Sequence, residues 1–261
     1  MNIDTGKLAG LLKTEQFPLS SKYDPEWVLR NQTGRDALRL TEWLSQKTEM
    51  KPGMRVLDMG CGKAISSIFL AKEFGVQVWA NDLWISASDN WQRIQEAGLE
   101  HQVRPIHAEA HSLSYAEEFF DAILCVDAYA YFGTEDPYLD YFRKFVRPEG
   151  QIETVVLGLM PNLDSGVPEH LAPRQESDGA FWGSDCWSFH PANWWRHHWE
   201  RTGLVQVEVA DVLPEGWRLW LQFDRARIAT GTNQFPSDEE ALEADGGRYI
   251  ALVRLVSRRR E

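Results

Sequence analysis

A short motif with one acid and two glycines, Asp58-Met59-Gly60-Cys61-Gly62, is the first place in the chain where ligand chemistry can be predicted. It follows an apolar run that begins at Val56 and is typical of a buried strand. A glycine at position 60 can adopt a positive φ, and one at position 62 has no Cβ, so backbone N–H groups can approach a ligand closely. The motif therefore favours a nucleotide-binding loop, although an ordinary turn between a strand and a helix also fits it.

A second acid, Asp82, lies about 20 residues after the glycine loop and ends another strand-like run, residues 76–82. Nucleotide-binding folds place an acid at this point to bind the ribose hydroxyls. A dinucleotide fits poorly, because the carboxylate of Asp58 would repel a pyrophosphate. A cationic ligand with a free amino group would suit that carboxylate.

These residues resemble the first two motifs of the class I S-adenosylmethionine-dependent methyltransferases, in which Asp/Glu-x-Gly-x-Gly precedes a second strand that ends in an acid. The resemblance covers roughly residues 51–157 and points to bacterial small-molecule methyltransferases of the quinone-biosynthesis and cyclopropane-synthase type. It implies S-adenosylmethionine as the cofactor. It also implies an α/β fold, with a Rossmann-like seven-stranded methyltransferase sheet, an antiparallel strand seven, helices on both faces and C-terminal lid insertions.

The resemblance further implies which residues bind the cofactor. In such enzymes the residue after the strand-two acid packs on the adenine, and here that residue is Leu83, with Trp84 either sharing the role or serving the fold. Glu109 stands in place of an Asp that accepts a hydrogen bond from the adenine amino group, and the backbone of Ala110 is the alternative contact. The implied cofactor-binding residues are Asp58, Gly60, Cys61, Gly62, Asp82, Leu83, Trp84, Glu109, Ala110 and Asp127.

Other polar and aromatic residues are expected on the acceptor side of the cofactor. The apolar run at residues 120–127 predicts a strand buried on both faces, and ligands of open α/β sheets lie outside the carboxyl ends of such strands. More than half of the 12 tryptophans lie between Trp182 and Trp220, where they form either cation–π walls or a lid that excludes water by bulk. We expect catalytic roles for Asp127, Tyr129 and His190, with His107 and His111 as alternative bases, and acceptor contacts from Tyr23, Trp27, Tyr131, Trp182 and Trp194.

The elements that must position these residues follow from periodicity and turn signals. Residues 1–50 are expected to form an N-terminal arm and lid helices, and residues 51–261 a methyltransferase domain with substrate-lid insertions at 158–190 and 211–247. Residues 20–31 are expected either to pack on the edge of the domain or to cover the cofactor. Helices are predicted at 34–50, 63–75, 87–98, 138–146, 191–203, 216–227 and 237–245, and strands at 76–82, 103–107, 120–127, 151–157, 205–209 and 248–256, the last antiparallel between the fifth and sixth strands.

Composition narrows the class of protein. The chain of 261 residues carries a net charge of -12, which argues against a nucleic-acid surface, because such surfaces need clustered Lys and Arg. The basic run at residues 258–260 is expected to be a solvated tail. The three cysteines have no metal-like spacing, and the sequence shows no hydrophobic leader or long apolar stretch. We therefore expect a cytoplasmic monomer or homodimer that has no metal site and binds neither nucleic acid nor a membrane.

The expected activity is methyl transfer to an N, O or S nucleophile of a small molecule. An in-line displacement at a sulfonium methyl needs a positioned nucleophile and a dry site, and it needs a base only where the acceptor loses a proton. The sequence lacks an Asn-Pro-Pro-Tyr motif and a Pro-Cys nucleophile, two motifs of enzymes that methylate macromolecules. The alternatives are a non-catalytic S-adenosylmethionine-binding regulatory or partner protein and, less favoured, a macromolecule methyltransferase.

Overall fold

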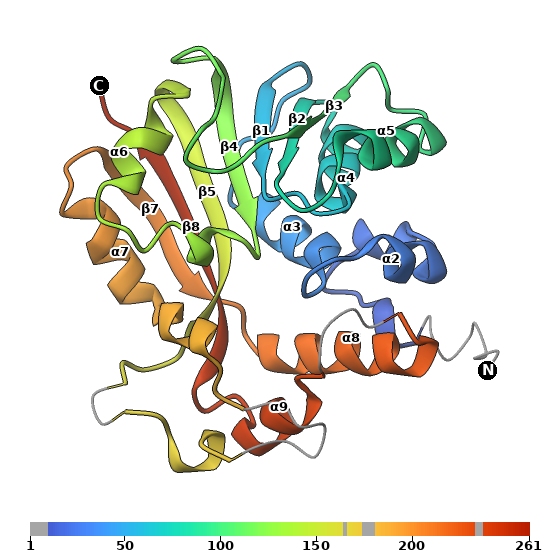
Figure 1. Cartoon of the computed structure of the whole chain (residues 1–261), viewed down its shortest axis with the longest axis vertical. Coiled ribbons are helices and arrows are strands. Elements are labelled where there is room, and N and C mark those ends of the chain that lie inside the picture. Colours follow the sequence, from blue (N-terminus) through green and yellow to red (C-terminus); the bar gives the residue numbers. More distant parts are fainter. Residues whose placement is uncertain (1–9, 164–165, 174–180, 233–236) are drawn as a thin grey trace.

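An eight-stranded sheet runs through the part of the chain that the computed structural model describes, residues 10–163, 166–173, 181–232 and 237–261 (Figure 1). The main strands follow the order β3-β2-β1-β4-β5-β8-β7, and the short strand β6 pairs with β5. The predicted N-terminal arm and both predicted lid insertions lie partly outside the described residues. The strands are β1 (Arg55–Met59), β2 (Gln77–Asp82), β3 (Val103–His107), β4 (Phe120–Val126), β5 (Val146–Leu159), β6 (His190–Pro191), β7 (Val205–Val212) and β8 (Ile250–Arg259).

Strand directions confirm the predicted fold class. β8 runs antiparallel to both of its neighbours, β5 and β7, whereas the other strand pairs within the described residues are parallel. The last strand therefore lies between the fifth and sixth long strands of the sheet, as the resemblance implied. β1 and β4 are buried along almost their whole length, which is typical of parallel strands that are covered on both faces.

Helices cover both faces of the sheet, because successive side chains of a strand point to opposite sides. Val56 packs in one hydrophobic cluster with residues of α3, α4 and α5, whereas the next residue, Leu57, packs in another with residues of α6 and α7. The helices are α2 (Pro25–Asn31), α3 (Ala37–Ser45), α4 (Ile65–Phe74), α5 (Ala87–Glu96), α6 (Tyr138–Arg143), α7 (Ala192–Glu200), α8 (Gly216–Thr230) and α9 (Glu239–Asp245), with short 3₁₀ turns η1 (Ser20–Lys22), η2 (Tyr129–Tyr131), η3 (Glu169–Leu171) and η4 (Ser184–Ser188).

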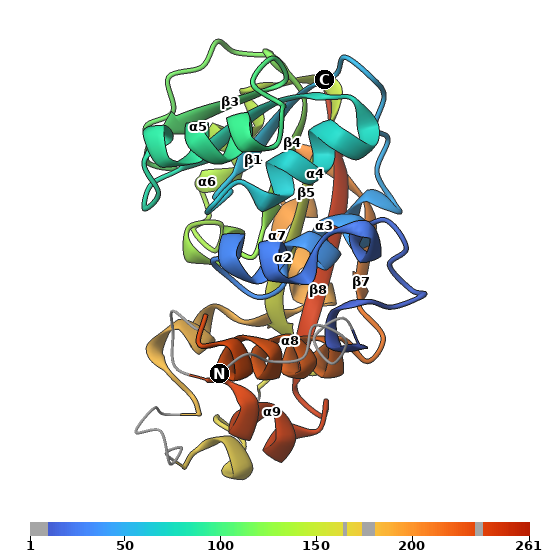
Figure 2. The ribbon, with the colours of Figure 1, turned by 90° about the vertical axis from the view of Figure 1, so that its right-hand side faces the viewer.

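The C-terminal helices α8 and α9 lie at one end of the sheet, beneath α2 and α3 (Figures 1 and 2). A third hydrophobic cluster joins α8 to the N-terminal part of the chain, because Phe223 of α8 packs in it with Leu29 of α2 and Phe69 of α4. Segments from both ends of the sequence thus meet on one side of the domain.

Residues 20–31 pack on the edge of the domain, which decides between the two expectations for them. The Tyr23 side chain is buried, its ring centroid lies 6.0 Å from that of Phe69, and its hydroxyl donates to Glu73 at 3.1 Å. Trp27 lies 5.7 Å from Tyr23, ring centroid to ring centroid, in the same cluster. The structure therefore packs Tyr23 and Trp27 with Phe69 of α4 and does not bring either ring to the lining of the cavity described below.

The basic run at the end of the sequence belongs to the sheet. Arg258 pairs across β8 and β5 with Gln151, and its side chain forms an ion pair with Glu208 at 2.7 Å. Arg259 pairs with Val205 of β7 and contacts Glu118 at 3.1 Å. The predicted solvated tail is wrong for these two arginines, because the backbone ladder of β8 continues through them.

Candidate cofactor and acceptor site

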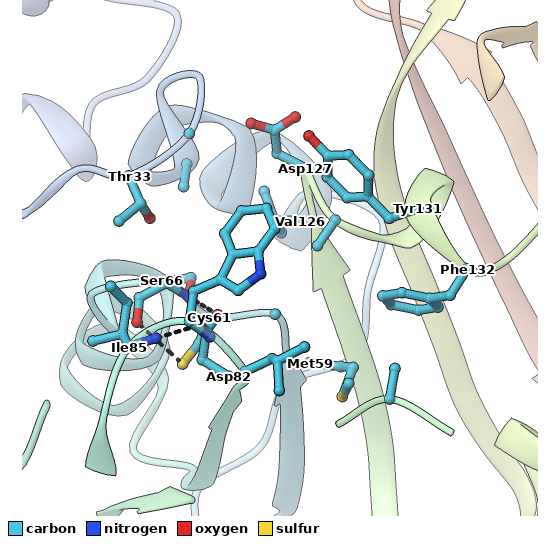
Figure 3. Close-up of a pocket in the computed structure, with 18 of the residues that line it drawn as sticks. Thr33, Met59, Cys61, Ser66, Asp82, Ile85, Val126, Asp127, Tyr131 and Phe132 are labelled. Carbon is cyan, nitrogen blue, oxygen red and sulfur yellow. Dashed lines mark hydrogen bonds between the residues drawn. The ribbon is translucent and has the colours of Figure 1, made fainter. Parts of the chain in front are cut away.

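A cavity of about 480 Å³ opens at the carboxyl ends of β1, β2 and β4 (Figure 3). Its lining combines the glycine loop after β1, the residues that follow β2, β3 and β4, and the loop that precedes α3. A cavity of this size can hold a small organic ligand. In Figure 3, Cys61 and Asp82 lie at one end of the cavity, and Asp127 and Tyr131 lie at the other.

The glycine loop is shaped by close contacts with distant parts of the chain. Gly60 and Gly62 have φ angles of 75° and 55°, in the left-handed region that favours glycine. A Cβ at Gly60 would lie 2.5 Å from Cβ of Ala128, and a Cβ at Gly62 would lie 1.9 Å from Oγ1 of Thr33. Both positions therefore need glycine for the turn itself, and both line the cavity.

Asp82 holds the glycine loop and the start of the next loop together. Its Oδ2 accepts the N–H of Gly62 at 2.8 Å, and its Oδ1 accepts the N–H groups of Trp84 at 2.8 Å and Ile85 at 2.9 Å. The carboxylate is buried but borders the cavity. A carboxylate has about four acceptor positions, so Asp82 keeps capacity for one hydroxyl of a ligand.

Asp58 is not among the residues that line the cavity, and one of its carboxylate oxygens, Oδ1, has no hydrogen-bond partner among the described residues. Its side chain is 1% exposed and accepts hydrogen bonds from Ser66 Oγ at 2.6 Å and Ser67 Oγ at 2.5 Å. Burial raises the pKa of Asp58 to about 6, against the opposing effect of these hydroxyls. The acid therefore ties the end of β1 to the first turn of α4, because both serines lie there.

Two large apolar side chains stand exposed at the rim of the cavity after β2. Leu83 is 49% exposed and Trp84 is 72% exposed, although their chemistry favours burial. The Trp84 ring meets the Tyr131 ring edge to face, with centroids 6.1 Å apart. These rings come from the ends of β2 and β4, so they span the mouth of the cavity.

Glu109 and His111 form a pair at the wall that follows β3. Glu109 accepts the backbone N–H of His111 at 2.9 Å, and its Oε1 lies 2.7 Å from His111 Nδ1. The hydrogen bond with Glu109 raises the pKa of His111 and lowers that of Glu109. Both residues line the cavity together with the buried Ala110, so the carboxylate predicted to meet the adenine is shared with a histidine.

Arg35 joins three parts of the chain beside the cavity. Its backbone N–H donates to Oδ2 of Asp127 at 2.8 Å, and its guanidinium lies 4.0 Å from Asp127 Oδ1 and 3.4 Å from Asp238 Oδ2. The guanidinium also lies 4.9 Å from the ring centroid of Trp220. Burial raises the pKa of Asp127, and the positive charge of Arg35 opposes that shift. Arg35 thus connects the end of β4 with α8 and the start of α9.

The loop around Arg35 was missed as a cavity wall by reasoning from the sequence. Thr33, Gly34, Arg35 and Ala37 all line the cavity, whereas the predicted lid lay at residues 20–31. Arg227 of α8 donates to the carbonyl oxygen of Gly34 at 3.4 Å and so holds this loop from the other side. A glycine followed by an arginine between two helical patterns was the available signal, but it does not reveal which distant residues the loop meets.

Three residues predicted near the reaction centre lie outside the lining of the cavity, and one of them, Tyr129, is in the hydrophobic core. Tyr129 is fully buried and packs against Trp199 at 5.4 Å between ring centroids, so it does not line the cavity. His190 stacks on Trp194 at 3.6 Å, and burial lowers its pKa to about 4. The structure therefore does not bring Tyr129, His190 or Trp194 to the lining of this cavity.

Trp182 is also absent from the lining of the cavity within the described residues. Its ring lies 5.7 Å from that of Trp187 and 6.4 Å from that of Phe189, and it packs against the first hydrophobic cluster. His107, one alternative base, is bound to the carbonyl oxygen of Leu83 at 2.7 Å. The structure therefore places Trp182 among aromatic neighbours and not in the lining of this cavity.

The described residues show neither a metal site nor a membrane-spanning helix. In the described ranges, no group of three or more His, Cys, Asp and Glu side chains is arranged to hold a metal ion. Within those same ranges, none of the helices combines the length and the apolar character that crossing a bilayer requires.

Part of this chain is similar in sequence to known methyltransferases. Residues 56–150 match the family model of the methyltransferase domain. The methyltransferase GfsG of Streptomyces halstedii is 28% identical over 139 residues, which cover 50% of this chain and 49% of that protein. The glycine/sarcosine/dimethylglycine N-methyltransferase of Actinopolyspora halophila is 24% identical over 44% of this chain and 20% of that protein. The chain thus spans about half or less of the length of these relatives.

Solved structures of similar fold cover more of the chain. The [4+2]-cyclase SpnF superposes with a TM-score of 0.65 at 17% identity and covers 85% of this chain and 81% of its own. A geranyl diphosphate methyltransferase in complex with S-adenosylmethionine superposes with a TM-score of 0.62 at 18% identity, covering 84% of each chain. Residues 56–150 thus match a methyltransferase domain, and the chain has the fold of solved S-adenosylmethionine-dependent methyltransferases.

Proposed function

We propose that this protein transfers the methyl group of S-adenosylmethionine to a nucleophilic atom of a small-molecule acceptor. The observation that carries the proposal is the junction of Asp82 with the glycine loop: one carboxylate binds Gly62 and the loop after β2 at the wall of the cavity. This arrangement suits a nucleoside whose ribose hydroxyls meet an acid and whose remaining groups lie along an exposed backbone turn.

The residues present fit such a cofactor. Asp82 would accept from the ribose, Leu83 would pack on the adenine, and Glu109 or the backbone of Ala110 would meet the adenine amino group. Gly60, Cys61 and Gly62 would run beside the amino-acid part of the cofactor, since they line the same wall. When bound, S-adenosylmethionine supplies an electrophilic methyl group on a sulfonium.

The chain's own contribution is positioning and the exclusion of water. Arg35 and Gly34 close one side of the cavity, held there by Asp127 and Arg227. Met59, Val126 and Phe132 give the cavity an apolar wall. Such a dry, shaped site supports an in-line displacement, which depends on holding the nucleophile within about 3–3.5 Å of the carbon.

A small acceptor is favoured by the size of the cavity and by the relatives. GfsG aside, the similar proteins carry names of small-molecule enzymes, among them sterol, phosphoethanolamine and glycine or sarcosine methyltransferases. A second candidate function is a cyclisation. A protein of the same fold is named as a [4+2]-cyclase, and one fold can host more than one reaction.

Two measurements test the proposal. Calorimetry with S-adenosylmethionine and S-adenosylhomocysteine should show binding, and a panel of amines, alcohols, phenols and thiols should include an acceptor that releases S-adenosylhomocysteine. Absence of cofactor binding contradicts the proposal. Cofactor binding without methyl transfer to any acceptor pool supports the alternative, a protein that binds S-adenosylmethionine for another purpose.

A further inference from the structure

The charge balance of the cavity limits which acceptors it can receive. Within the described lining, Arg35 is the single Arg or Lys side chain, and two carboxylates already face it: Asp127 at 4.0 Å and Asp238 at 3.4 Å. Its guanidinium face is also occupied by the ring of Trp220. The positive charge of Arg35 is therefore offset by two nearby carboxylates, which weakens its attraction for a phosphate or carboxylate of an acceptor.

The other residue of the lining that can carry a positive charge is also occupied. His111 Nδ1 lies 2.7 Å from Glu109 Oε1, and its Nε2 lies 3.6 Å from Glu135 Oε2. An anionic acceptor would consequently enter a cavity in which each cation of the described lining already has carboxylate partners. Moving an unpaired anion out of water into such a site is unfavourable.

Two exposed aromatic rings complete the acceptor end of the cavity. Trp84 and Tyr131 meet edge to face across the mouth, and no other ring contact of Trp84 is present among the described residues. Figure 3 shows Tyr131 beside the carboxylate of Asp127, at the end of the cavity away from Cys61 and Asp82. Because the Trp84 ring contacts Tyr131, we assign the packing on the adenine to Leu83 alone. Aromatic faces next to carboxylates attract organic cations.

We propose that the acceptor is a primary or secondary amine that enters the site as its ammonium form, against Trp84 and Tyr131 and within the field of Asp127 and Asp238. This inference rests on the proposed methyltransferase function and names its substrate class. The ammonium first loses a proton to solvent. The nitrogen lone pair then forms the N–C bond to the methyl carbon while the C–S bond breaks, and that electron pair stays on sulfur as a neutral thioether. The product leaves as a methylated ammonium.

Three probes with one scaffold and different charges test the proposal: 2-phenylethylamine, 2-phenylethanol and 3-phenylpropionate. Each is titrated into the full-length protein that has been saturated with S-adenosylhomocysteine. We expect the amine to bind at least about tenfold more tightly than either of the others, since cation–π contacts and the excess of two carboxylates over one guanidinium both favour a cation. Equal or tighter binding of the alcohol or the carboxylate overturns the proposal, as does the absence of measurable binding by the amine.

Substitutions at Trp84, Tyr131 and Asp238 test whether these residues cause the preference for the amine. Trp84→Leu and Tyr131→Leu should each weaken binding of the amine about threefold to tenfold and leave that of 2-phenylethanol less affected. Trp91→Leu is the matched control, because Trp91 is an exposed tryptophan on α5 outside the lining of the cavity. Asp238→Asn removes one partner of Arg35, so binding of 3-phenylpropionate should improve relative to the amine. If neither aromatic variant changes the preference, these rings do not form the acceptor site.

The affinity for S-adenosylhomocysteine separates this inference from the proposed function. It is measured first for the parent and for every variant. A parent protein that does not bind S-adenosylhomocysteine contradicts the proposed function itself. A parent that binds it but shows no preference for the amine leaves the function intact and overturns the substrate class alone.

Discussion

The backbone N–H of Arg35 lies 2.8 Å from Oδ2 of Asp127, although 92 positions separate the two residues in the sequence. Asp127 follows β4 with a φ of 58°, a left-handed conformation that Asp tolerates better than most residues. This turn presents the carboxylate to the loop before α3 and closes one side of the cavity. The contact explains why a segment outside the methyltransferase motifs forms part of the site.

Because this loop closes one side of the cavity, Gly34→Ala should strongly reduce the affinity for S-adenosylhomocysteine. A Cβ at this position would lie 2.3 Å from Oδ2 of Asp127, so either the carboxylate or the loop must move. We expect the affinity for S-adenosylhomocysteine to fall about tenfold, as an overpacked contact costs on the order of 1–3 kcal/mol. Gly183→Ala is the control, since a Cβ there meets nothing within 4 Å. Equal affinity of both variants in calorimetry would show that the loop does not bear on the cofactor.

Asp82→Ala should weaken cofactor binding and also lower Tm. The carboxylate accepts from the backbone amides of Gly62, Trp84 and Ile85, so its loss leaves these donors unpaired as well as the proposed ribose contact. We expect a loss of about 1–3 kcal/mol in the binding of S-adenosylmethionine. Asp82→Asn keeps one oxygen acceptor and should fall between the parent and Ala. A folded Asp82→Ala variant with parental affinity would place the ribose elsewhere.

The buried acid Glu153 should make the stability of the folded protein depend on pH. Its side chain is 1% exposed in β5, neither of its carboxyl oxygens has a hydrogen-bond partner, and burial raises its pKa well above the usual range. The unfolded chain therefore loses this proton first as pH rises, and stability falls from the unfolded pKa upward through the folded pKa. Glu153→Met should raise Tm, and the gain should be larger at pH 8 than at pH 5.

An exposed glutamate provides the comparison for Glu153. Glu200 is 42% exposed by side chain and forms an ion pair with Arg196 at 3.2 Å. Glu200→Met should change Tm little at either pH, because surface ion pairs contribute about 0–1 kcal/mol. A Glu153→Met variant that loses stability equally at both pH values would show that the buried acid is charged and paired in the folded protein.

His190 is predicted to matter for stability rather than for chemistry. Its ring stacks on Trp194 and its pKa is lowered to about 4, so the folded protein keeps it neutral while the unfolded chain protonates it at higher pH. Its contribution to stability is therefore present above the unfolded pKa, near 6.5, and is lost as pH falls toward 4. His190→Gln should lower Tm at pH 7 and leave kcat/KM for an identified acceptor within about threefold. A selective loss of kcat would restore His190 as a base.

The amino-acid sequence determined the features that depend on neighbouring residues. Short apolar runs predicted the buried strands, and Gly60 predicted a turn with left-handed backbone, because conformational preferences of a strand and a glycine act locally. Asp82 was predicted at the end of β2 for the same reason, and it borders the cavity. The place of the last strand, antiparallel between the fifth and sixth long strands, followed from the resemblance.

Only the tertiary structure decided which side chains meet in the cavity. Tyr129 and Tyr131 stand two positions apart, yet the turn η2 sends the first into the core against Trp199 and the second to the mouth of the cavity. Asp58 lies in the motif itself but faces Ser66 of α4, while Arg35 comes from outside the motif and borders the cavity. Such contacts depend on packing between segments far apart in the chain. A local sequence pattern does not indicate which distant segments pack against each other.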